Sequence, residues 1–543
     1  MNPLLLTDGY KTGHHQQYPQ NTTLVYSNFT PRSNKYAPKG CDRVVSFGQQ
    51  MVMQQIHEVF HNEFFSKPKE DVCGEMKREL SMYLGTDYDV THFEELHDLG
   101  YLPIHVKGIM EGTLVPIKVP VLTIYNTHPK FYWVTNYLET ILSNLLWKPM
   151  TSATIAHTYR KVLTKWQGKT DAEKGWFIDW QGHDFSMRGM DSVEAVISSG
   201  LGHLTSFSGT DSLPTLYGAR KFYREKEFIG GSVNATEHSV MCAGGADDEV
   251  GTFRRLLETY PKGILSVVSD TWDLWKVCTE HIVTLKEEIL SRDGKLVIRP
   301  DSGDPVDIIC GDAWRVQGFT EGVLNKVGEN GVVLNYTDNK YYKVKLNSNY
   351  EVIGEETIDV TPANKGVIEL LWDVFGGTIN DQGYKVLDPH IGAIYGDSIT
   401  IDRAEEICSR LEAKGFASTN IVLGVGSFTY QFNTRDTFGF AMKATYVELS
   451  EFKITDYGNP GTEVPVRVKR GREIFKDPIT DDGTKKSATG LLCVTKHNEN
   501  GYMLVDKVSW ETEANGELQT IYKDGEFKNM TTLTEIRNRL KNN

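Results

Sequence analysis

Four apolar runs, each ending in a polar or glycine-rich cluster and followed by a helical pattern, limit the possible folds most strongly. They are ILSVVSD (264–270), KLVIRPD (295–301), IGAIYGD (391–397) and NIVLGVG (420–426). Asp270 lies 31 residues before Asp301, and Asp397 lies 27 residues before Gly424, which is about the length of a strand, a crossover helix and a return strand. The sequence therefore predicts βα units with buried, parallel strands.

Polar residues close these predicted strands, and the carboxyl ends of parallel strands meet at one edge of a sheet. Asp270, Arg299, Asp301 and Asp397 are therefore expected to face a common site. Each acid taken alone could equally be a turn or helix-cap residue.

The chain divides into three segments with different patterns. Residues 1–165 mix short apolar strands with amphipathic helices such as 49–65 and 131–146, as in an α+β domain. Residues 166–430 hold the βα units, with an insertion near 315–365 in which 332–356 reads as a β-meander. Residues 431–543 form a C-terminal segment in which 456–473 is predicted to be a loop or hairpin.

Charge and cysteine usage exclude several classes of protein. The chain has 58 Lys and Arg against 72 acids, a net charge of -14 that would repel nucleic acid and anionic membranes. An anionic ligand would need a local basic cluster. Seven scattered cysteines fit neither a disulfide framework nor a zinc ribbon. With no signal peptide or membrane span in the sequence, we expect a soluble, cytoplasmic protein that binds neither nucleic acid nor membrane.

Several short segments carry groups that bind phosphate. Arginine can grip phosphate through two parallel hydrogen bonds, and a nearby carboxylate can bind a sugar diol or Mg²⁺. Glycine-rich backbone adds amide donors, although a G-x-G pattern alone is weak evidence for a phosphate site. Exposed lysines often only keep the surface solvated. The segments are HDFSMRG (183–189), VIRPDSGDP (297–305), GVGSFTYQFNTRDTFGFAMKAT (424–445), FKDP (475–478) and TKKS (484–487). Together they are typical of a polyphosphate site.

HEVFH (57–61) suggests a different class, because H-E-x-x-H on a helix can bind zinc in a metallopeptidase. The surrounding residues place Met53, Ile56 and Phe60 on one apolar helix face, which His57 and His61 could simply flank. No third-ligand motif follows. We keep the zinc peptidase as a remote alternative.

The histidine of NATEHSVM (234–241) could be a packing residue, a metal ligand or a reactive group. Glu237 precedes His238 directly. Since neighbours along a strand point in opposite directions, Glu237 is expected to orient His238 poorly.

Taken in order, the short segments resemble the nicotinamide phosphoribosyltransferase family. The resemblance implies a type II phosphoribosyltransferase fold, in which an α/β barrel-like domain packs on a second α/β (α+β) domain. It also implies a pentosyltransferase of NAD salvage that joins nicotinamide to 5-phosphoribosyl 1-pyrophosphate, giving nicotinamide mononucleotide and pyrophosphate. The segments are LLLTDGYKTGHHQQYP (4–19), HDFSMRG, SGTD (208–211), TEHS (236–239), SVVSD (266–270), IRPDSGDP, YGD (395–397), TRD (434–436) and FKDP.

The same resemblance implies a homodimer with active sites at the interface, where residues 431–543 return to the N-terminal domain and complete the partner's site. Tyr10 of one subunit and Phe185 of the other would sandwich the nicotinamide ring, with Arg299 beside it. Asp211 would accept from the carboxamide NH₂. The positions that would bind ribose, phosphate and diphosphate are Arg188, Ser266, Arg299, Asp301, Gly396, Asp397, Gly426, Arg435, Lys443, Lys476 and Lys485.

For catalysis, the resemblance implies that ATP, as co-substrate, phosphorylates His238 and that Asp270 orients its ring. A carboxylate can fix the tautomer and stabilise the charged ring, leaving the other nitrogen free to attack. Asp301 completes the expected catalytic set. Mg²⁺ is expected on the substrate pyrophosphate, through protein ligands that the sequence does not identify.

The chain departs from the family at GVGSFTYQF, where Ser427 and Phe428 replace glycines. The closest alternative function is that of a nicotinate phosphoribosyltransferase. An ionised Asp211 would accept from an amide and repel a carboxylate, which favours nicotinamide. A ligand-sensing or signalling role on the same fold is disfavoured by the full set of phosphate and ring contacts.

Overall fold

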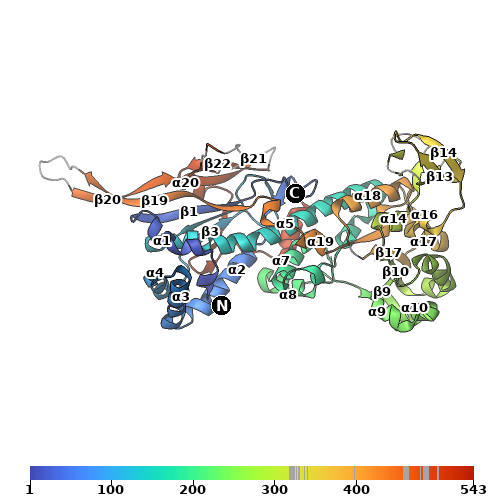
Figure 1. Ribbon diagram of the computed structural model, residues 1–543, viewed down its shortest axis with the longest axis horizontal. Helices are drawn as coiled ribbons and strands as arrows, with labels where there is room; N and C mark the ends of the chain where they lie inside the picture. The colour runs from blue at the N-terminus through green and yellow to red at the C-terminus, as the bar shows by residue number, and fades with distance from the viewer. Residues whose placement is uncertain are drawn as a thin grey trace.

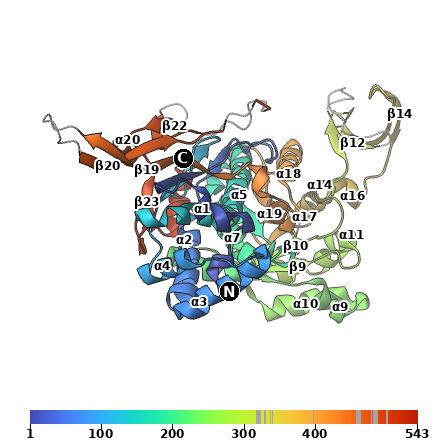
Figure 2. The same ribbon diagram turned by 60° about the vertical axis from the view of Figure 1, so that its left-hand side comes forward.

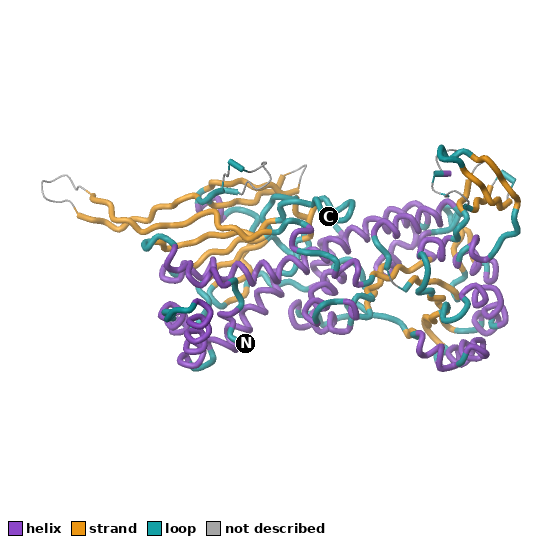
Figure 3. Tube along the Cα trace, viewed as in Figure 1, coloured by secondary structure: helices purple, strands orange, loops and turns teal. Residues whose placement is uncertain are grey.

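Two seven-stranded sheets and one long helix, α5 (Tyr132–Thr170), organise the chain (Figures 1 and 3). In this computed structural model, the described residues are 1–316, 324–325, 327, 331–335, 337–338, 340–396, 398–455, 464–476, 479–480, 488–497 and 501–542. Among them, no helix combines the length and the apolar character that crossing a membrane requires.

The second sheet contains the predicted βα strands, all paired in parallel. Its order is β7 (Gly209–Thr210), β6 (Gly182–Asp184), β18 (Ile421–Val425), β17 (Ile391–Tyr395), β10 (Asp293–Arg299), β9 (Lys262–Val268) and β8 (Asn234–Ala235). The four apolar runs form β9, β10, β17 and β18, which confirms the predicted βα rhythm.

This parallel sheet curls until its two edges approach each other. Gly209 of edge strand β7 forms a parallel bridge with Gly231, which lies just before the opposite edge strand, β8. The Thr210 amide donates to the Gly231 carbonyl at 3.0 Å, and the Gly231 amide donates to the Ser208 carbonyl at 2.9 Å. The sheet is therefore barrel-like, and its strand ends converge on one mouth.

Helices follow the strands of the curled sheet along the chain. They are α7 (Val193–Leu204), α8 (Leu213–Tyr223), α9 (His238–Gly244), α10 (Glu249–Thr259), α11 (Leu274–Lys276), α12 (Ile282–Thr284), α13 (Lys286–Leu290), α14 (Pro305–Cys310), α16 (Pro362–Lys365), α17 (Val367–Phe375), α18 (Ile401–Ala413) and α19 (Ser427–Gln431).

The first sheet combines strands from both ends of the chain, and its described strand pairs are all antiparallel. Against it lie α2 (Gln49–Phe60), α3 (Lys69–Leu84), α4 (Thr91–Leu99) and α21 (Leu533–Lys541). The strand order of this first sheet is β20 (Val464–Glu473), β19 (Ala441–Thr455), β1 (Thr22–Thr30), β5 (Leu122–Asn126), β3 (Ile104–Gly108), β23 (Gln519–Lys523) and β24 (Glu526–Phe527). The C-terminal strands thus share a sheet with the N-terminal ones.

Helix α5 belongs to the hydrophobic cores of both sheets. Apolar side chains between Trp133 and Ala153 are buried in the first core, and others between Ile155 and Trp166 are buried in the second. Burying each large apolar side chain contributes about 1.5–3 kcal/mol, so this helix fixes the two sheets against each other. Helix α5 also continues past residue 165, where the sequence predicts a domain boundary. That boundary stays a prediction.

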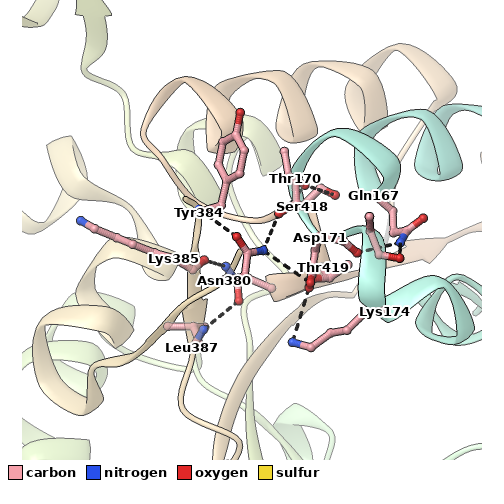
Figure 4. A network of polar contacts seen from close by, with 12 residues as sticks. Gln167, Thr170, Asp171, Lys174, Asn380, Tyr384, Lys385, Leu387, Ser418 and Thr419 are labelled. Atoms are coloured by element: carbon pink, nitrogen blue, oxygen red, sulfur yellow. Dashed lines mark hydrogen bonds and ion pairs between the residues drawn. The ribbon is translucent and has the colours of Figure 1, made fainter. Parts of the chain in front are cut away.

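A polar network ties the C-terminal end of α5 to the barrel (Figure 4). Asn380 donates to the Thr170 carbonyl at 2.7 Å, and the Thr170 hydroxyl donates to Ser418 at 3.0 Å. Asp171 accepts from the Thr419 hydroxyl and pairs with Lys174 at 3.5 Å. Because Asp171 and Thr170 are buried, these contacts satisfy polar groups that would otherwise be costly.

The insertion forms its own small sheet at the far end of the barrel (Figures 1 and 2). The predicted meander is present as β12 (Val332–Asn335), β13 (Lys340–Leu346) and β14 (Val352–Thr357), with β11 (Trp314–Val316) parallel to β12. In the predicted loop or hairpin, 464–473 is strand β20, and 456–463 lie outside the described residues.

A buried ion pair joins β3 to α20 (Trp510–Ala514), which lies 406 residues later in the chain. Lys107 Nζ lies 3.0 Å from Glu513 Oε2 and donates to the Glu513 carbonyl at 3.2 Å. Both side chains are buried. Removing one partner would leave the other charge buried and uncompensated.

We therefore expect Lys107→Met to lower the free energy of unfolding by about 3–5 kcal/mol, as measured by urea denaturation. The exposed pair Lys528–Glu526 supplies the control, since Lys528→Met should cost less than about 1 kcal/mol. Equal effects of the two substitutions would show that the buried pair does not hold the C-terminal segment in place.

Candidate active site

The carboxyl ends of β9 and β10 are tied together by Asp270, whose side chain is only 4% exposed. Its Oδ2 accepts from the backbone amides of Asp301 at 2.8 Å and Ser302 at 2.7 Å. The Ser302 hydroxyl also donates to Oδ2, at 2.5 Å. One carboxylate oxygen is thus used to hold the loop that follows β10. The other, Oδ1, is buried without a hydrogen-bond donor among the described residues.

His238 faces that free oxygen. Its Nε2 lies 3.9 Å from Asp270 Oδ1 and 3.8 Å from Asp301 Oδ2, distances that suit an ion pair but exceed a hydrogen bond. Its Nδ1 lies 3.1 Å from the Thr271 hydroxyl. The side chain is 46% exposed, so the ring combines an acidic surrounding with access from solvent.

The strand geometry expected around Glu237 is wrong, because the strand β8 ends at Ala235 and His238 begins helix α9. Glu237 is the N-cap residue of α9, and its carboxylate accepts from the Ser239 hydroxyl. Within the described contacts, Glu237 therefore binds Ser239, and the two acids facing His238 come from other strand ends.

Phe185 and Arg299 form a corner at the ends of β6 and β10. The Arg299 guanidinium lies 5.1 Å from the centre of the Phe185 ring, within cation–π range. Arg299 Nη1 donates to the Thr236 carbonyl at 3.3 Å, and its buried Nε has no partner among the described residues. His183 covers part of the same ring, at a centroid distance of 4.5 Å.

Asp211 follows the short strand β7 and contacts two donors. Its Oδ1 lies 2.8 Å from His183 Nε2 and accepts from the Ser232 hydroxyl. Burial alone would raise the pKa of Asp211, but the bonds from His183 and Ser232 and the charge of Arg299 lower it below its usual value. Asp211 is therefore an ionised acceptor at neutral pH.

Gly396 lets the loop after β17 approach Asp301 and Arg299. A Cβ at this position would lie 2.5 Å from Asp301 Oδ1 and 3.0 Å from Arg299 Nε. Only glycine leaves room for both side chains. The next predicted residue, Asp397, lies outside the described residues.

The altered glycine-rich loop packs against the loop that carries Arg188. Gly426 precedes α19, and a Cβ on Gly189 would overlap the Ser427 hydroxyl. Arg188 itself is exposed, and so is Phe428. Ser427 therefore supports the neighbouring loop by direct contact. On β9, Ser266 is buried with a hydroxyl that has no partner among the described residues.

A second group of predicted residues lies away from this mouth, on or beside the antiparallel sheet. Burial, and next to it the positive charges of Arg32, Lys476 and Arg435, lowers the pKa of Lys443 on β19. These cationic side chains therefore lie close enough to repel one another. Tyr10 is 67% exposed, and its ring contacts His14. Lys485 lies outside the described residues.

The two groups are separated within one chain. Figure 1 shows β19 with the N-terminal sheet on the left and β9 and β10 on the right, with α5 between them. Among the described residues, no ring contact joins Tyr10 to Phe185. The barrel mouth thus gathers Phe185, Asp211, His238, Ser266, Asp270, Arg299, Asp301 and Gly396 without the second group.

The site residues predicted from the sequence do not include four polar residues of the mouth: His183, Ser232, Thr271 and Ser302. His183, Thr271 and Ser302 lie next to or near predicted site residues in the chain, and strand-end position could have singled them out. Ser232 lies in a short connection before β8. It meets Asp211 only because the sheet curls, which no local pattern reports.

HEVFH does not resemble a metal site in its contacts. His57 Nδ1 lies 3.2 Å from the Tyr522 hydroxyl, and its ring packs on Phe527 at 5.3 Å. Burial and the neighbouring His61 lower the pKa of His57. Among the described residues, no group of three or more His, Cys, Asp or Glu side chains could hold a metal ion. His57 packs at the interface of α2 with β23 and β24.

Comparisons with known proteins identify the family to which this chain is similar. Residues 180–500 match the nicotinate phosphoribosyltransferase (NAPRTase) family, and residues 2–105 match the N-terminal domain of nicotinamide phosphoribosyltransferase. A protein named nicotinamide phosphoribosyltransferase from Acinetobacter baylyi is 45% identical, covering 99% of this chain and 97% of its own. One of the same name from Mycoplasma pneumoniae is 32% identical, covering 90% and 94%.

Comparison with solved structures identifies the fold. The crystal structure of nicotinate-nucleotide pyrophosphorylase from Pyrococcus furiosus aligns with a TM-score of 0.51 at 13% identity, covering 100% of this chain and 95% of that one. The predicted fold class and family are confirmed. The match over residues 180–500 and the near full-length relatives show that the chain belongs to the nicotinate phosphoribosyltransferase (NAPRTase) family, among relatives named nicotinamide phosphoribosyltransferase.

Proposed function

We propose that this protein is a nicotinamide phosphoribosyltransferase, which converts nicotinamide and 5-phosphoribosyl 1-pyrophosphate to nicotinamide mononucleotide and pyrophosphate. The observation that carries the proposal is Asp211, an ionised acceptor beside the ring corner of Phe185 and Arg299. The names of the relatives support the same reaction.

In the transfer step, the pyridine nitrogen of nicotinamide attacks C1 of the ribose while the bond from C1 to the pyrophosphate oxygen breaks. Positive charge develops on the ribose, and the exposed carboxylate of Asp301 at the end of β10 stabilises it. Arg299 and Arg188 supply charge-assisted hydrogen bonds to phosphate oxygens. The protein's part is chiefly to position the two substrates and to neutralise charge.

ATP is coupled through His238 in this proposal. A ring nitrogen attacks the γ-phosphorus, the P–N bond forms, the bond to the bridging oxygen breaks, and ADP leaves. The free Oδ1 of Asp270 and the carboxylate of Asp301 face Nε2, where they stabilise the positive ring. Water later cleaves the P–N bond to release phosphate.

Mg²⁺ is proposed as the cofactor on the pyrophosphate. Asp301 is exposed at the mouth, and Asp270 Oδ1 has no donor among the described residues. Carboxylate oxygens of this kind fit an ion held mainly by substrate phosphates and water. The chemistry that Mg²⁺ supplies when bound is neutralisation of the departing pyrophosphate.

We further propose a cytoplasmic homodimer in which a second copy supplies Tyr10, Arg435, Lys443 and Lys476 to the mouth. The separation of β19, which carries Lys443, from β9 and β10 within one chain supports this arrangement (Figure 1). A tyrosine stacked on the other face of the ring would complete the sandwich begun by Phe185.

One assay tests the function. Purified protein with nicotinamide, phosphoribosyl pyrophosphate and Mg²⁺ is expected to form nicotinamide mononucleotide, faster with ATP than without it. Parallel reactions replace nicotinamide with nicotinate. A kcat/KM for nicotinate equal to or above that for nicotinamide would overturn the assignment in favour of a nicotinate phosphoribosyltransferase.

A further inference from the structure

We propose that His183, supported by Ser232, is a positioning residue that sets the choice of amide over acid by fixing which oxygen of Asp211 faces the substrate. The inference rests on the proposed function and concerns how its specificity arises. It follows from the distribution of hydrogen bonds around one carboxylate.

The two oxygens of Asp211 have different surroundings. Oδ1 lies 2.8 Å from His183 Nε2 and also accepts from the Ser232 hydroxyl. Among the described residues, no donor reaches Oδ2. Since the Asp211 side chain is 40% exposed, Oδ2 is the oxygen left for a ligand.

His183 is itself held firmly. Its side chain is 9% exposed, and its ring packs on Phe185 at a centroid distance of 4.5 Å. On the other side it fits against Gly209, where a Cβ would lie 2.7 Å from Nδ1. A carboxylate only accepts hydrogen bonds, so the ring nitrogen facing Asp211 carries the proton.

These contacts make the subsite an acceptor. An ionised Oδ2 receives a hydrogen bond from the carboxamide NH₂ of nicotinamide and repels the carboxylate of nicotinate. The hydrogen bond from His183 on β6 and the charge of Arg299 on β10 both favour the ionised form of Asp211. Without the His183 bond, the carboxylate could rotate, and a proton on it would remove the discrimination.

The test compares two replacements of His183 by the ratio of kcat/KM for nicotinamide to that for nicotinate. His183→Leu removes the donor and should lower this ratio by about 10-fold or more, since a lost bond to a charged group weakens discrimination by that order. His183→Gln places an amide NH near the position of Nε2 and should keep the ratio within about 3-fold of the wild type. A purely structural role would instead lower both kcat/KM values together.

Two further readouts separate positioning from loss of fold. Ser232→Ala should lower the ratio and Ser232→Thr should retain it. In His183→Leu, the acidic limb of the pH profile for nicotinamide kcat/KM should move to higher pH, because the bond that lowers the pKa of Asp211 is gone. An unchanged ratio and an unchanged limb in a folded His183→Leu protein would overturn the inference. Failure of the wild type to form nicotinamide mononucleotide would instead overturn the proposed function.

Discussion

Asp211→Asn should reverse the substrate preference, lowering kcat/KM for nicotinamide by about 100-fold or more while raising that for nicotinate. The reason is the fixed orientation of residue 211. His183 and Ser232 both donate to Oδ1. In the asparagine variant, these donors hold the carbonyl oxygen, so the NH₂ group takes the place of Oδ2.

An NH₂ group in that place opposes the carboxamide NH₂ of nicotinamide and donates to the carboxylate of nicotinate. The change from acceptor to donor at one atom therefore changes kcat/KM for the two substrates in opposite directions. The measurement is steady-state kinetics with each substrate at saturating phosphoribosyl pyrophosphate.

The double variant His183→Leu with Asp211→Asn supplies the control. Without the His183 donor, the asparagine amide can turn and present either end, so the gain toward nicotinate should shrink. If Asp211→Asn lowers kcat/KM for both substrates equally, residue 211 does not contact the substituent that distinguishes them.

The sequence predicted the parallel strands well because their apolar runs are continuous and end in polar residues. Strands β9, β10, β17 and β18 lie where those runs are. Asp270, Arg299 and Asp301 could be placed at one mouth because parallel strand ends converge. The residue types alone did not show that one oxygen of Asp270 is consumed by the Ser302 loop.

Contacts made by the curling of the sheet could not be predicted. Ser232 reaches Asp211 because Gly209 bridges Gly231 across the two edges, a pairing between segments with no apolar periodicity. The helix that begins at His238 was missed for a related reason. NATEHSVM has short polar neighbours that fit a strand end or a helix start equally well. Local pattern therefore predicted the strand-end positions better than it predicted the residues that contact them.

The acidic surroundings of His238 lead to the second large effect. His238→Ala should abolish the stimulation by ATP, so that the ratio of kcat/KM with ATP to that without it falls to about one. The acids that would stabilise a phosphorylated ring, Asp270 and Asp301, lose their partner in this variant. Slow synthesis of nicotinamide mononucleotide without ATP should persist, because Phe185, Asp211 and Arg299 are untouched.

A phosphate on a histidine nitrogen is acid-labile and stable to base, so labelled γ-phosphate from ATP should appear on the wild type with that stability and be absent from His238→Ala. His390, which lies just before β17 at the opposite end of the strands, provides the matched control. His390→Ala should retain both the label and the stimulation. Since α9 is short and the His238 side chain is half exposed, its loss should leave the urea midpoint nearly unchanged. Retained labelling in His238→Ala would assign the phosphate to another residue, and loss of folding would assign His238 a structural role.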